Sequence, residues 1–380
     1  MALKSKHPLT KEVAMGQPLL DGTDFKIGIF SPNCSGGLAV TAIKERWGAS
    51  WEDNLALAHL ADEVGIDFLL PIARWIGYGG TTNFHESVLD PVVWAAGILA
   101  ETKRITAFAT VHTAFTHPLV AAKQLATIDA IGAGRAGLNI VAGWNKPEYE
   151  TFGVSLPEDH DDRYALAQEW WDVVRQVWSA QERFDHDGRF FHLRHVEGAP
   201  KPTYGSIPIL NAGSSVQGRD FAARNANFAF TVVGGPDDGR DVVAGIRAAA
   251  RDHYQRDMGV FTLGHVVCRP TAAEAEDYLH YYADEHADWE AVDNLMSLQG
   301  LHAQSFTKEM LQSFRGRFAA GHGSCPLVGT PDMVADEMAR FAEAGFAGMT
   351  VAFVDYVGEL SYFAQEVLPR LEAQGVRLPR

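Results

Sequence analysis

The sequence predicts an α/β protein whose eight parallel strands close into a (β/α)8 barrel, the TIM-barrel architecture. Short apolar runs alternate with helical patterns along the chain. Each run is apolar almost throughout, which is typical of strands buried on both faces of a parallel sheet. At 380 residues the chain is long enough for one such barrel. The expected strands are residues 25–32, 67–72, 104–111, 136–143, 207–213, 227–233, 261–270 and 348–356.

Helices are expected after these strands, and several carry end signals. Residues 53–64 are amphipathic and are followed by Gly65, which favours a helix end. Asp90 and Pro91 favour a helix start, because proline fits the first helical turn. Residues 118–131 and 161–178 have helical patterns, and acidic residues open the second, where the helix dipole favours them.

Two segments stand outside the alternation. Residues 1–24 are polar and broken by proline and glycine, so we expect an N-terminal arm. Residues from about 280 to 325 read as a helical insertion before the last strand, of the kind that often caps a barrel mouth. Since no linker composition divides the rest, we expect residues 25–380 to form a single barrel domain.

Composition excludes several classes of partner. The chain carries 32 Lys+Arg against 48 Asp+Glu, a net charge of −16, and it has no basic run. Nucleic acids and anionic membrane surfaces both require clustered positive charge, so neither is an expected partner. No apolar stretch is long enough to span a membrane, and the first residues do not read as a secretory signal. Three widely spaced cysteines favour a reduced, cytoplasmic setting.

Two known sequence motifs are present, but the residues around them argue against a binding site. Residues 132–137 spell GxGxxG, but this run follows a helix and precedes a strand, the reverse of the order that a dinucleotide site needs. The glycines are better explained as a helix end and a turn. The pairs His192/His195 and His286/Glu290 have near-metal spacing but no third ligand nearby, so no metal site is expected.

The most informative stretch is residues 137–150, GLNIVAGWNKPEYE. Asn139 lies inside an apolar strand, where a buried amide must find partners. Trp144 and Glu148 follow in the loop after that strand. Polar side chains at the carboxyl end of a barrel strand are candidate ligand contacts. The alternative for Asn139 is a buried amide satisfied by the backbone, and the residue alone does not decide between the two.

A second group of residues predicts an anion site at the same barrel end. The segment NAGSS, with Ser214 and Ser215 at its end, follows the fifth strand and offers hydroxyls and backbone N–H groups at a helix start. Arg163 and Tyr164 could add a guanidinium and a phenol to the same anion. Ordinary turn and helix-cap chemistry would explain each feature singly, so the prediction rests on their convergence.

These segments carry a family resemblance. The runs NCSGGLAV, GYGG, AAKQLATIDAIGAGRAGLNIVAGWNKPEYE, HDDRY and NAGSS resemble the bacterial-luciferase-like, reduced-flavin-dependent monooxygenases, in particular the dimethylsulfone and pyrimidine monooxygenases. The similarity covers residues 25–235 and continues more weakly near the C-terminus. It implies the same eightfold barrel, reduced FMN, O2, and a separate NAD(P)H-dependent flavin reductase that supplies the reduced cofactor. It also implies a homo-oligomer by analogy.

The resemblance assigns residues by position. The flavin-contact positions of the family fall on Ala73, Arg74, Asn139, Glu148, Arg163, Tyr164 and Ser215. In such enzymes the asparagine faces the isoalloxazine ring, while the arginine, tyrosine and serine hold the phosphate. Pyrimidine monooxygenases carry lysine where this chain has Arg74, and neither group of relatives has histidine at the position of His112.

The catalytic candidates are therefore Asn139, His112 and Trp144. His112 follows the third strand and is expected to titrate near neutral pH, which suits a substrate-side acid or base; a loop histidine without a role is the alternative. Trp75, Tyr78, Phe115 and Trp144 are expected near the mouth and could line a substrate pocket.

The predicted activity is oxidation of a small organic substrate by reduced FMN and O2. Because the resembling enzymes cleave C–S or C–N bonds, a sulfone-like or cyclic amide-like substrate is expected. Two other functions stay open. One is an F420-dependent oxidoreductase of the same fold, which turnover with F420 instead of FMN would identify. The other is a non-catalytic flavin-binding protein, which would bind FMN without a coupled oxidation.

Overall fold

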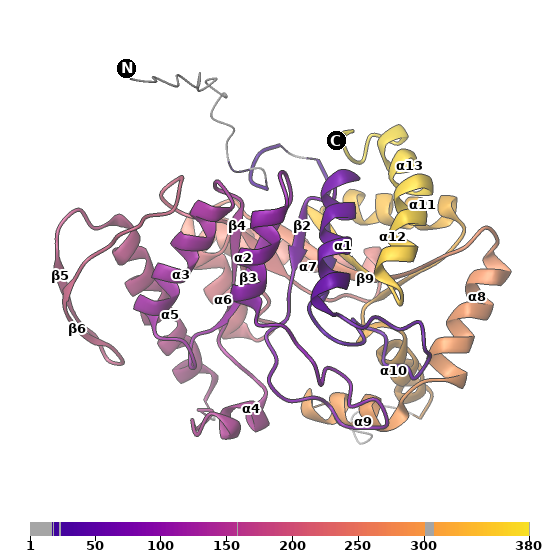
Figure 1. Cartoon of the computed structure of the whole chain (residues 1–380), viewed down its shortest axis with the longest axis horizontal. Coiled ribbons are helices and arrows are strands. Elements are labelled where there is room, and N and C mark those ends of the chain that lie inside the picture. The colour runs from indigo at the N-terminus through magenta and orange to yellow at the C-terminus, as the bar shows by residue number, and fades with distance from the viewer. Residues whose placement is uncertain (1–16, 18, 23, 158, 301–307, 380) are drawn as a thin grey trace, which may run out of the picture.

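The computed structural model describes residues 17, 19–22, 24–157, 159–300 and 308–379, and within them the predicted barrel is confirmed (Figure 1). The strands pair in parallel in the order β9–β11–β1–β2–β3–β4–β7–β8, and β8 pairs back to β9, which closes the ring. Most of the arm predicted for residues 1–24 lies outside the described residues. The ring strands are β1 (Lys26–Phe30), β2 (Phe68–Leu70), β3 (Thr106–His112), β4 (Ala136–Val141), β7 (Ile209–Asn211), β8 (Phe228–Phe230), β9 (Gly259–Cys268) and β11 (Gly348–Ala352).

Helices surround this ring, as the alternation predicted. The outer helices are α1 (Trp51–Glu63), α2 (Pro91–Glu101), α3 (Pro118–Ile131), α5 (His160–Ser179), α6 (Val216–Asn225), α7 (Pro236–Tyr254), α11 (Pro331–Glu343), α12 (Tyr356–Glu366) and α13 (Leu368–Ala373). In the described part of the chain, no helix is both long and apolar enough to cross a membrane.

The helix ends follow the sequence signals. Asp90 accepts hydrogen bonds from the first backbone N–H groups of α2, and Asp159 caps α5 in the same way. Gly132 ends α3, and Gly134 follows with a φ of +90°, a conformation that favours glycine. The GxGxxG run is therefore a helix end and a turn.

The interior of the barrel is filled near its amino end by a layer of four phenylalanine rings. Phe68 stacks on Phe261 with ring centroids 5.1 Å apart and meets Phe108 edge-on at 5.7 Å, and Phe228 stacks on Phe261 at 4.3 Å. Glycines on neighbouring strands leave room for these rings. A Cβ at Gly137 would lie 2.7 Å from the ring of Phe108. The barrel therefore has a solid aromatic floor rather than a pore.

Two strand features were not predicted. Strands β5 (Phe184–Asp187) and β6 (His192–Val196) form an antiparallel hairpin that projects from the barrel beside α5, at the left of Figure 1. Strand β10 (Cys325–Gly329) pairs with the second half of β9, outside the eightfold ring. The pair His192/His195 thus lies on β6, a mostly exposed strand of this hairpin.

Between β9 and α11 the chain forms a mostly helical segment at the carboxyl end of the barrel. Its elements before β10 are α8 (Ala272–His280), the π-helical turn η1 (Tyr281–Glu285), α9 (Trp289–Leu298) and α10 (Lys308–Gly321). Helices α9 and α10 lie at the same end as α4 (Lys146–Thr151), opposite α13 in Figure 1.

This segment is bound to the loops that follow β1 and β2. The backbone N–H of Val40 donates to the carbonyl of Ala319 at 2.9 Å. Asn294 Nδ2 donates to the carbonyl of Tyr78 at 2.9 Å, and a second, smaller hydrophobic core joins the segment to both loops. The described part of the segment is therefore a packed roof over the mouth.

Candidate active site

A buried ion pair joins two loops at the barrel mouth. Arg74 lies four residues after β2, and Glu148 lies in α4 after β4. Their side chains are almost completely buried, and Nη1 of Arg74 lies 2.9 Å from Oε1 of Glu148. The same carboxylate oxygen accepts the backbone N–H of Trp75 at 3.0 Å. Glu148 therefore holds the loop after β2 in place and compensates the positive charge of Arg74. Ala73, the residue before Arg74, is also buried.

Aromatic rings pack around this pair. The guanidinium of Arg74 lies 5.2 Å from the ring centroids of both Tyr78 and Trp144. Trp144 is 36% exposed, so it stands at the rim rather than in the core. Trp75 meets His112 edge-on at 5.3 Å. The aromatic residues predicted near the mouth thus gather there.

Asn139 is the first member of a series of hydrogen bonds inside the barrel. Its Nδ2 donates to Oγ1 of Thr110 at 3.2 Å, and Thr110 donates in turn to the carbonyl of Pro71 at 2.6 Å. The other amide atom, Oδ1, is buried and has no hydrogen-bond partner among the described residues. The amide is only half satisfied by protein, which leaves a buried acceptor for a ligand.

The burial and the protonation state of His112 differ from those expected from the sequence. It is the last residue of β3, is buried, and stacks on Phe115 with ring centroids 5.3 Å apart. Burial, aided by the positive charge of Arg74, lowers the pKa of His112 to about 3. The expectation that it titrates near neutral pH is therefore wrong, because the imidazole is neutral at pH 7 and can serve as a hydrogen-bonding group but not as a proton reservoir.

Two residues of the predicted anion site, Tyr164 and Ser215, lie together at the start of α6. Ser215 caps this helix by accepting the backbone N–H of Gly218 at 3.1 Å, and its side chain hydrogen-bonds the hydroxyl of Tyr164. Burial raises the pKa of Tyr164, so its hydroxyl stays protonated. A Cβ at Gly213 would lie 2.4 Å from that hydroxyl, which explains the glycine. Ser214 is exposed beside the cap.

Tyr149 is a buried phenol next to Glu148 in α4. Its hydroxyl donates to the carbonyl of Ala142 at 2.7 Å. Burial raises the pKa of Tyr149 to about 12, while the charge of Arg163 lowers it and that of Glu148 raises it. Both charged groups therefore act electrostatically on this buried phenol.

The structure adds two histidines, His85 and His322, to Tyr78, which was already expected near the mouth. Tyr78, His85 and His322 each have a buried polar atom without a hydrogen-bond partner in the described part of the chain. His85 belongs to the FHES run after β2, and His322 follows α10. They are 237 positions apart, so no local spacing could have paired them.

These groups fit a flavin mononucleotide. The predicted anion site offers a hydroxyl, a phenol, a guanidinium and helix N–H groups, which suit a phosphate dianion. Asn139 offers an unpartnered amide oxygen near the strand ends, which suits an N–H of a flat heteroaromatic ring. Arg163, Tyr164 and Ser215 would hold the phosphate, and Asn139 the ring.

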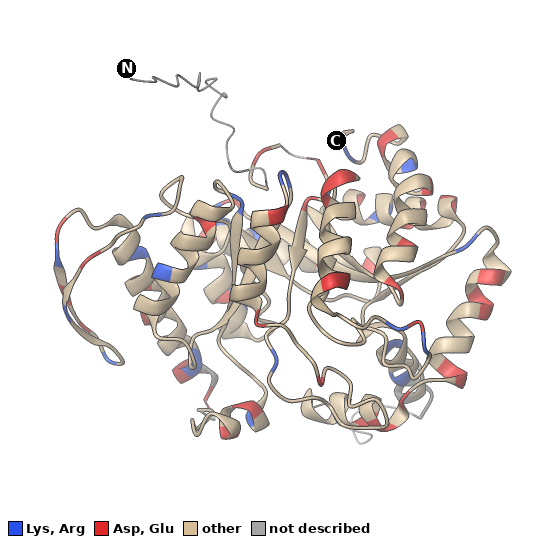
Figure 2. Cartoon of the chain, viewed as in Figure 1, with Lys and Arg blue, Asp and Glu red and all other residues tan. Residues whose placement is uncertain are grey.

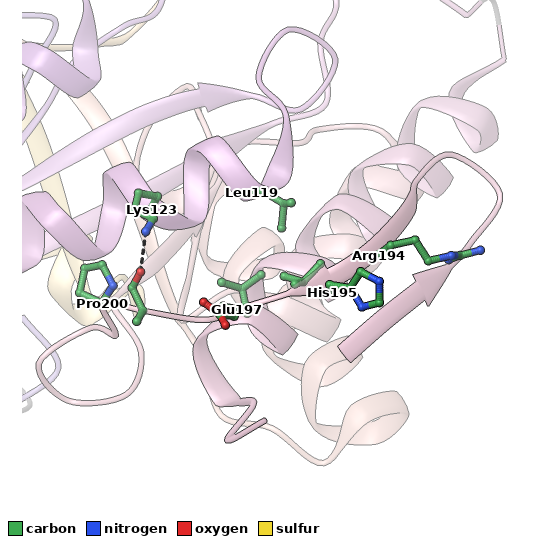
Figure 3. Close-up of a pocket in the computed structure, with 9 residues that line it drawn as sticks. Leu119, Lys123, Arg194, His195, Glu197 and Pro200 are labelled. Carbon is green, nitrogen blue, oxygen red and sulfur yellow. Dashed lines mark hydrogen bonds between the residues drawn. The ribbon is translucent and has the colours of Figure 1, made fainter. Parts of the chain in front are cut away.

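A pocket of about 280 Å³ lies on the outer surface, away from the mouth (Figure 3). It is lined by residues of α3, α5 and the β6 strand, but its charged groups already have partners. Lys123 donates to the carbonyl of Ala199 at 2.7 Å, and Arg194 pairs with Asp187 at 2.7 Å. The unpartnered buried polar atoms therefore favour the mouth over this pocket as the site of chemistry.

Comparisons with known proteins agree with this choice. A family model described as Luciferase-like monooxygenase matches residues 25–348. A pyrimidine monooxygenase, RutA, of Allorhizobium ampelinum is 30% identical over 370 residues, which cover 93% of this chain and 98% of the relative. An FMNH2-dependent dimethylsulfone monooxygenase of Pseudomonas fluorescens is 32% identical over 358 residues, covering 90% and 93%.

A solved structure agrees in fold. The riboflavin lyase RcaE, crystallised with a modified FMN and riboflavin, superposes with a TM-score of 0.84 at 22% identity and covers 94% of this chain and 93% of its own. The resemblance and the barrel predicted from sequence are both confirmed.

Proposed function

Because the chain belongs to the luciferase-like monooxygenases, a family of flavin-dependent oxidoreductases that use reduced FMN and O2, we propose that it is the oxygenase component of a two-component system. A separate NAD(P)H-dependent reductase supplies the reduced FMN. One oxygen atom enters a small organic substrate and the other leaves as water, with the flavin providing two electrons. We place this chemistry in the cytoplasm, where such reductants are available.

The substrate class follows from the two relatives. One is named for pyrimidines and the other for dimethylsulfone, so we propose oxidation beside a heteroatom with cleavage of a C–N or C–S bond. The observation that carries the proposal is the buried amide oxygen of Asn139, which has no hydrogen-bond partner among the described residues and lies at the same barrel end as the Ser215 cap and the Arg74–Glu148 pair. That arrangement suits a ligand with a phosphate at one end and a reactive ring at the other.

The side chains then have separate tasks. Arg163, Tyr164 and Ser215 bind the phosphate, and Asn139 orients the ring. Glu148 holds the loop that carries Arg74, and Trp144 covers the rim and limits the entry of water, which would otherwise compete with substrate.

The test combines binding and turnover. The chain is titrated with oxidised and reduced FMN and with F420, and is then supplied with a flavin reductase, NADH, ¹⁸O2 and candidate substrates. We expect FMN binding, substrate-dependent oxygen consumption and one ¹⁸O atom in the product. Turnover with F420 alone would show an F420-dependent oxidoreductase, and FMN binding without coupled oxidation across all substrates would favour a flavin-binding protein.

We also propose a homo-oligomer, as the family resemblance implies. Light scattering coupled to size-exclusion chromatography tests this, and a mass near the 41.5 kDa of a single chain would contradict it.

A further inference from the structure

Four side chains form a compact polar group beneath the roof segment: Arg74, Tyr78, His85 and His322, here called the imidazole cluster. The ring centroids of Tyr78 and His85 are 5.7 Å apart, those of Tyr78 and His322 6.3 Å, and those of the two histidines 6.2 Å. The guanidinium of Arg74 lies 5.2 Å from the Tyr78 ring. Loops after β2 and the end of α10 thus meet at this cluster.

Each member of the cluster has an unused hydrogen-bonding atom. Nε of Arg74, the hydroxyl of Tyr78 and Nδ1 of both histidines are buried and have no hydrogen-bond partner among the described residues. Buried polar atoms left unpaired cost about 1–3 kcal/mol each. Four of them in one place indicate that a polar ligand completes the cluster.

The hydrogen-bond partners fix the roles of the two rings. Nε2 of His85 lies 2.7 Å from the carbonyl of Gly37, so it carries the proton and Nδ1 is an acceptor. Nε2 of His322 lies 3.0 Å from the amide nitrogen of Gln299, which donates, so the proton of His322 is on Nδ1. The cluster therefore offers donors from Arg74 and His322, a hydroxyl from Tyr78, and an acceptor from His85.

The charged member of the cluster is a cation, the guanidinium of Arg74, although the chain carries a net charge of −16. Acidic residues are spread over outer helices such as α1 and α8 (Figure 2). Burial lowers the pKa of both histidines, and the positive charge of Arg74 lowers it further. At His85 the hydrogen bond to Gly37 opposes this shift, and His322 adds to it. An anion bound beside the two imidazoles would oppose the effect of Arg74 on them.

Backbone strain marks the same two residues. His85 has a φ of +61° and His322 a φ of +55°, in the left-handed region that non-glycine residues seldom adopt. Such conformations cost about 1–2 kcal/mol per residue and persist at binding and catalytic sites. The fold therefore maintains both rings in place at the expense of local stability.

We propose that the imidazole cluster is the substrate-recognition site and that it selects a small organic acid, bound as its anion, such as a sulfonate, sulfinate or carboxylate. This inference rests on the proposed function, because it assigns the substrate of that same mouth. The anion accepts from Nε of Arg74, Nδ1 of His322 and the hydroxyl of Tyr78.

A proton follows the anion into the cluster. Before binding, the charges of Arg74 and Glu148 compensate each other, so an added anion would be an uncompensated buried charge. Nδ1 of His85 is the free acceptor, and it takes one proton from solvent and restores neutrality. The titratable groups facing His85 are Arg74, Tyr78 and His322; Cys34 and Glu148 act on Tyr78.

The experiment measures binding without turnover. Isothermal titration calorimetry of the full chain, with and without oxidised FMN, compares methanesulfonate with dimethyl sulfone and acetate with acetamide. We expect each anion to bind at least about tenfold more tightly than its neutral partner, a difference of about 1.4 kcal/mol. Repeating the titration in buffers of different ionisation enthalpy should show about one proton taken up per anion.

Matched variants locate the effect. His85→Gln should abolish the proton uptake, and His322→Phe should lower anion affinity about tenfold without affecting the neutral compounds. His265→Gln is the control, because His265 is another buried imidazole but bonds Ser324 and lies outside the cluster. Circular dichroism checks that each variant is folded.

The wild-type chain alone decides the proposal. Equal affinity for the anion and its neutral partner, or anion binding without proton uptake, would overturn it even if a variant failed to fold. That result would leave FMN binding and oxygen consumption intact. Absence of FMN binding would instead contradict the proposed function, and anion binding would still be measurable on the chain without flavin.

Discussion

The two ends of the barrel are built from the same strands but differ in how their side chains are satisfied. At the amino end, glycines on neighbouring strands leave room for four rings that pack against one another, those of Phe68, Phe108, Phe228 and Phe261. At the carboxyl end, Asn139, Glu148, His85 and His112 are as deeply buried but have unpaired polar atoms. Both regions are buried, but only the carboxyl end has buried polar atoms without hydrogen-bond partners. This difference distinguishes a region that stabilises the fold from one that can bind a ligand.

The largest expected effect is loss of stability in acid. Burial lowers the pKa of His112 and of His265 to about 3, against 6.5 for the free side chain. The unfolded chain therefore binds more protons between these values, and stability falls as pH drops from 6.5 towards 3, by as much as about 5 kcal/mol per imidazole. Urea unfolding at pH 7 and at pH 4.5 measures this.

His265→Gln isolates one contribution to the acid effect. The variant removes one buried imidazole and should lose less stability than the wild type over the same pH interval. An identical pH dependence in both proteins would show that folding does not shift the pKa of His265.

Removing a ring from the amino-end floor should be the next largest effect. Phe68→Ala should lower the free energy of unfolding by about 3–5 kcal/mol, because it opens a cavity among close-packed rings. Oxygen consumption per folded molecule should stay within about twofold of the wild type. If Phe68→Ala lost turnover but kept the stability of the wild type, the amino end would not be the region that stabilises the fold.

Arg163→Ala tests the predicted anion site. It removes a charge-assisted contact, so FMN affinity should fall by about 1.5–3 kcal/mol. Fluorescence titration with FMN measures the affinity. Arg189→Ala is the matched control, since Arg189 is an exposed arginine that pairs with Asp162 on the same helix as Arg163. Equal losses in both variants would indicate a general charge effect rather than a phosphate contact.

Asn139→Ala should have the smallest effect of the series. We expect turnover to fall about tenfold while FMN affinity changes by less than about threefold, because one hydrogen bond to the ring is lost and the phosphate contacts remain. Asn54→Ala is the control: this buried asparagine bonds Ser50 and Trp94 in the outer helices, so its loss should affect stability only. Parallel loss of FMN affinity and turnover would make Asn139 a structural residue.

Local rules predicted much of the fold. The pattern placed a helix at residues 118–131, which are the bounds of α3, and the acidic run before α5 does cap that helix. The hairpin β5–β6 was missed because its residues are mostly polar and neither alternate nor form an apolar run. Strand β10 is only five residues long and contains Pro326, which weakens its strand pattern.

The candidate site was predictable where it follows a strand. Arg74, Asn139, Glu148 and Ser215 come from four different positions in the chain, and the closure of the barrel brings them to one end. The neutrality of His112 could not be anticipated, because it depends on burial by residues of other loops such as Trp75. The imidazole cluster depends on contacts over more than two hundred positions.

The register of β3 and β4 links the floor to the mouth. Phe108 pairs with Gly137, and two positions later Thr110 pairs with Asn139, so the aromatic layer lies directly beneath the amide proposed to face the flavin. A methyl group added at position 137 would press on Phe108 and push β4 outward, moving Asn139 without touching it. Gly137 therefore sets how deep a flat ring could lie in this barrel. A change of packing at Gly137 would alter the geometry of the site one layer above it.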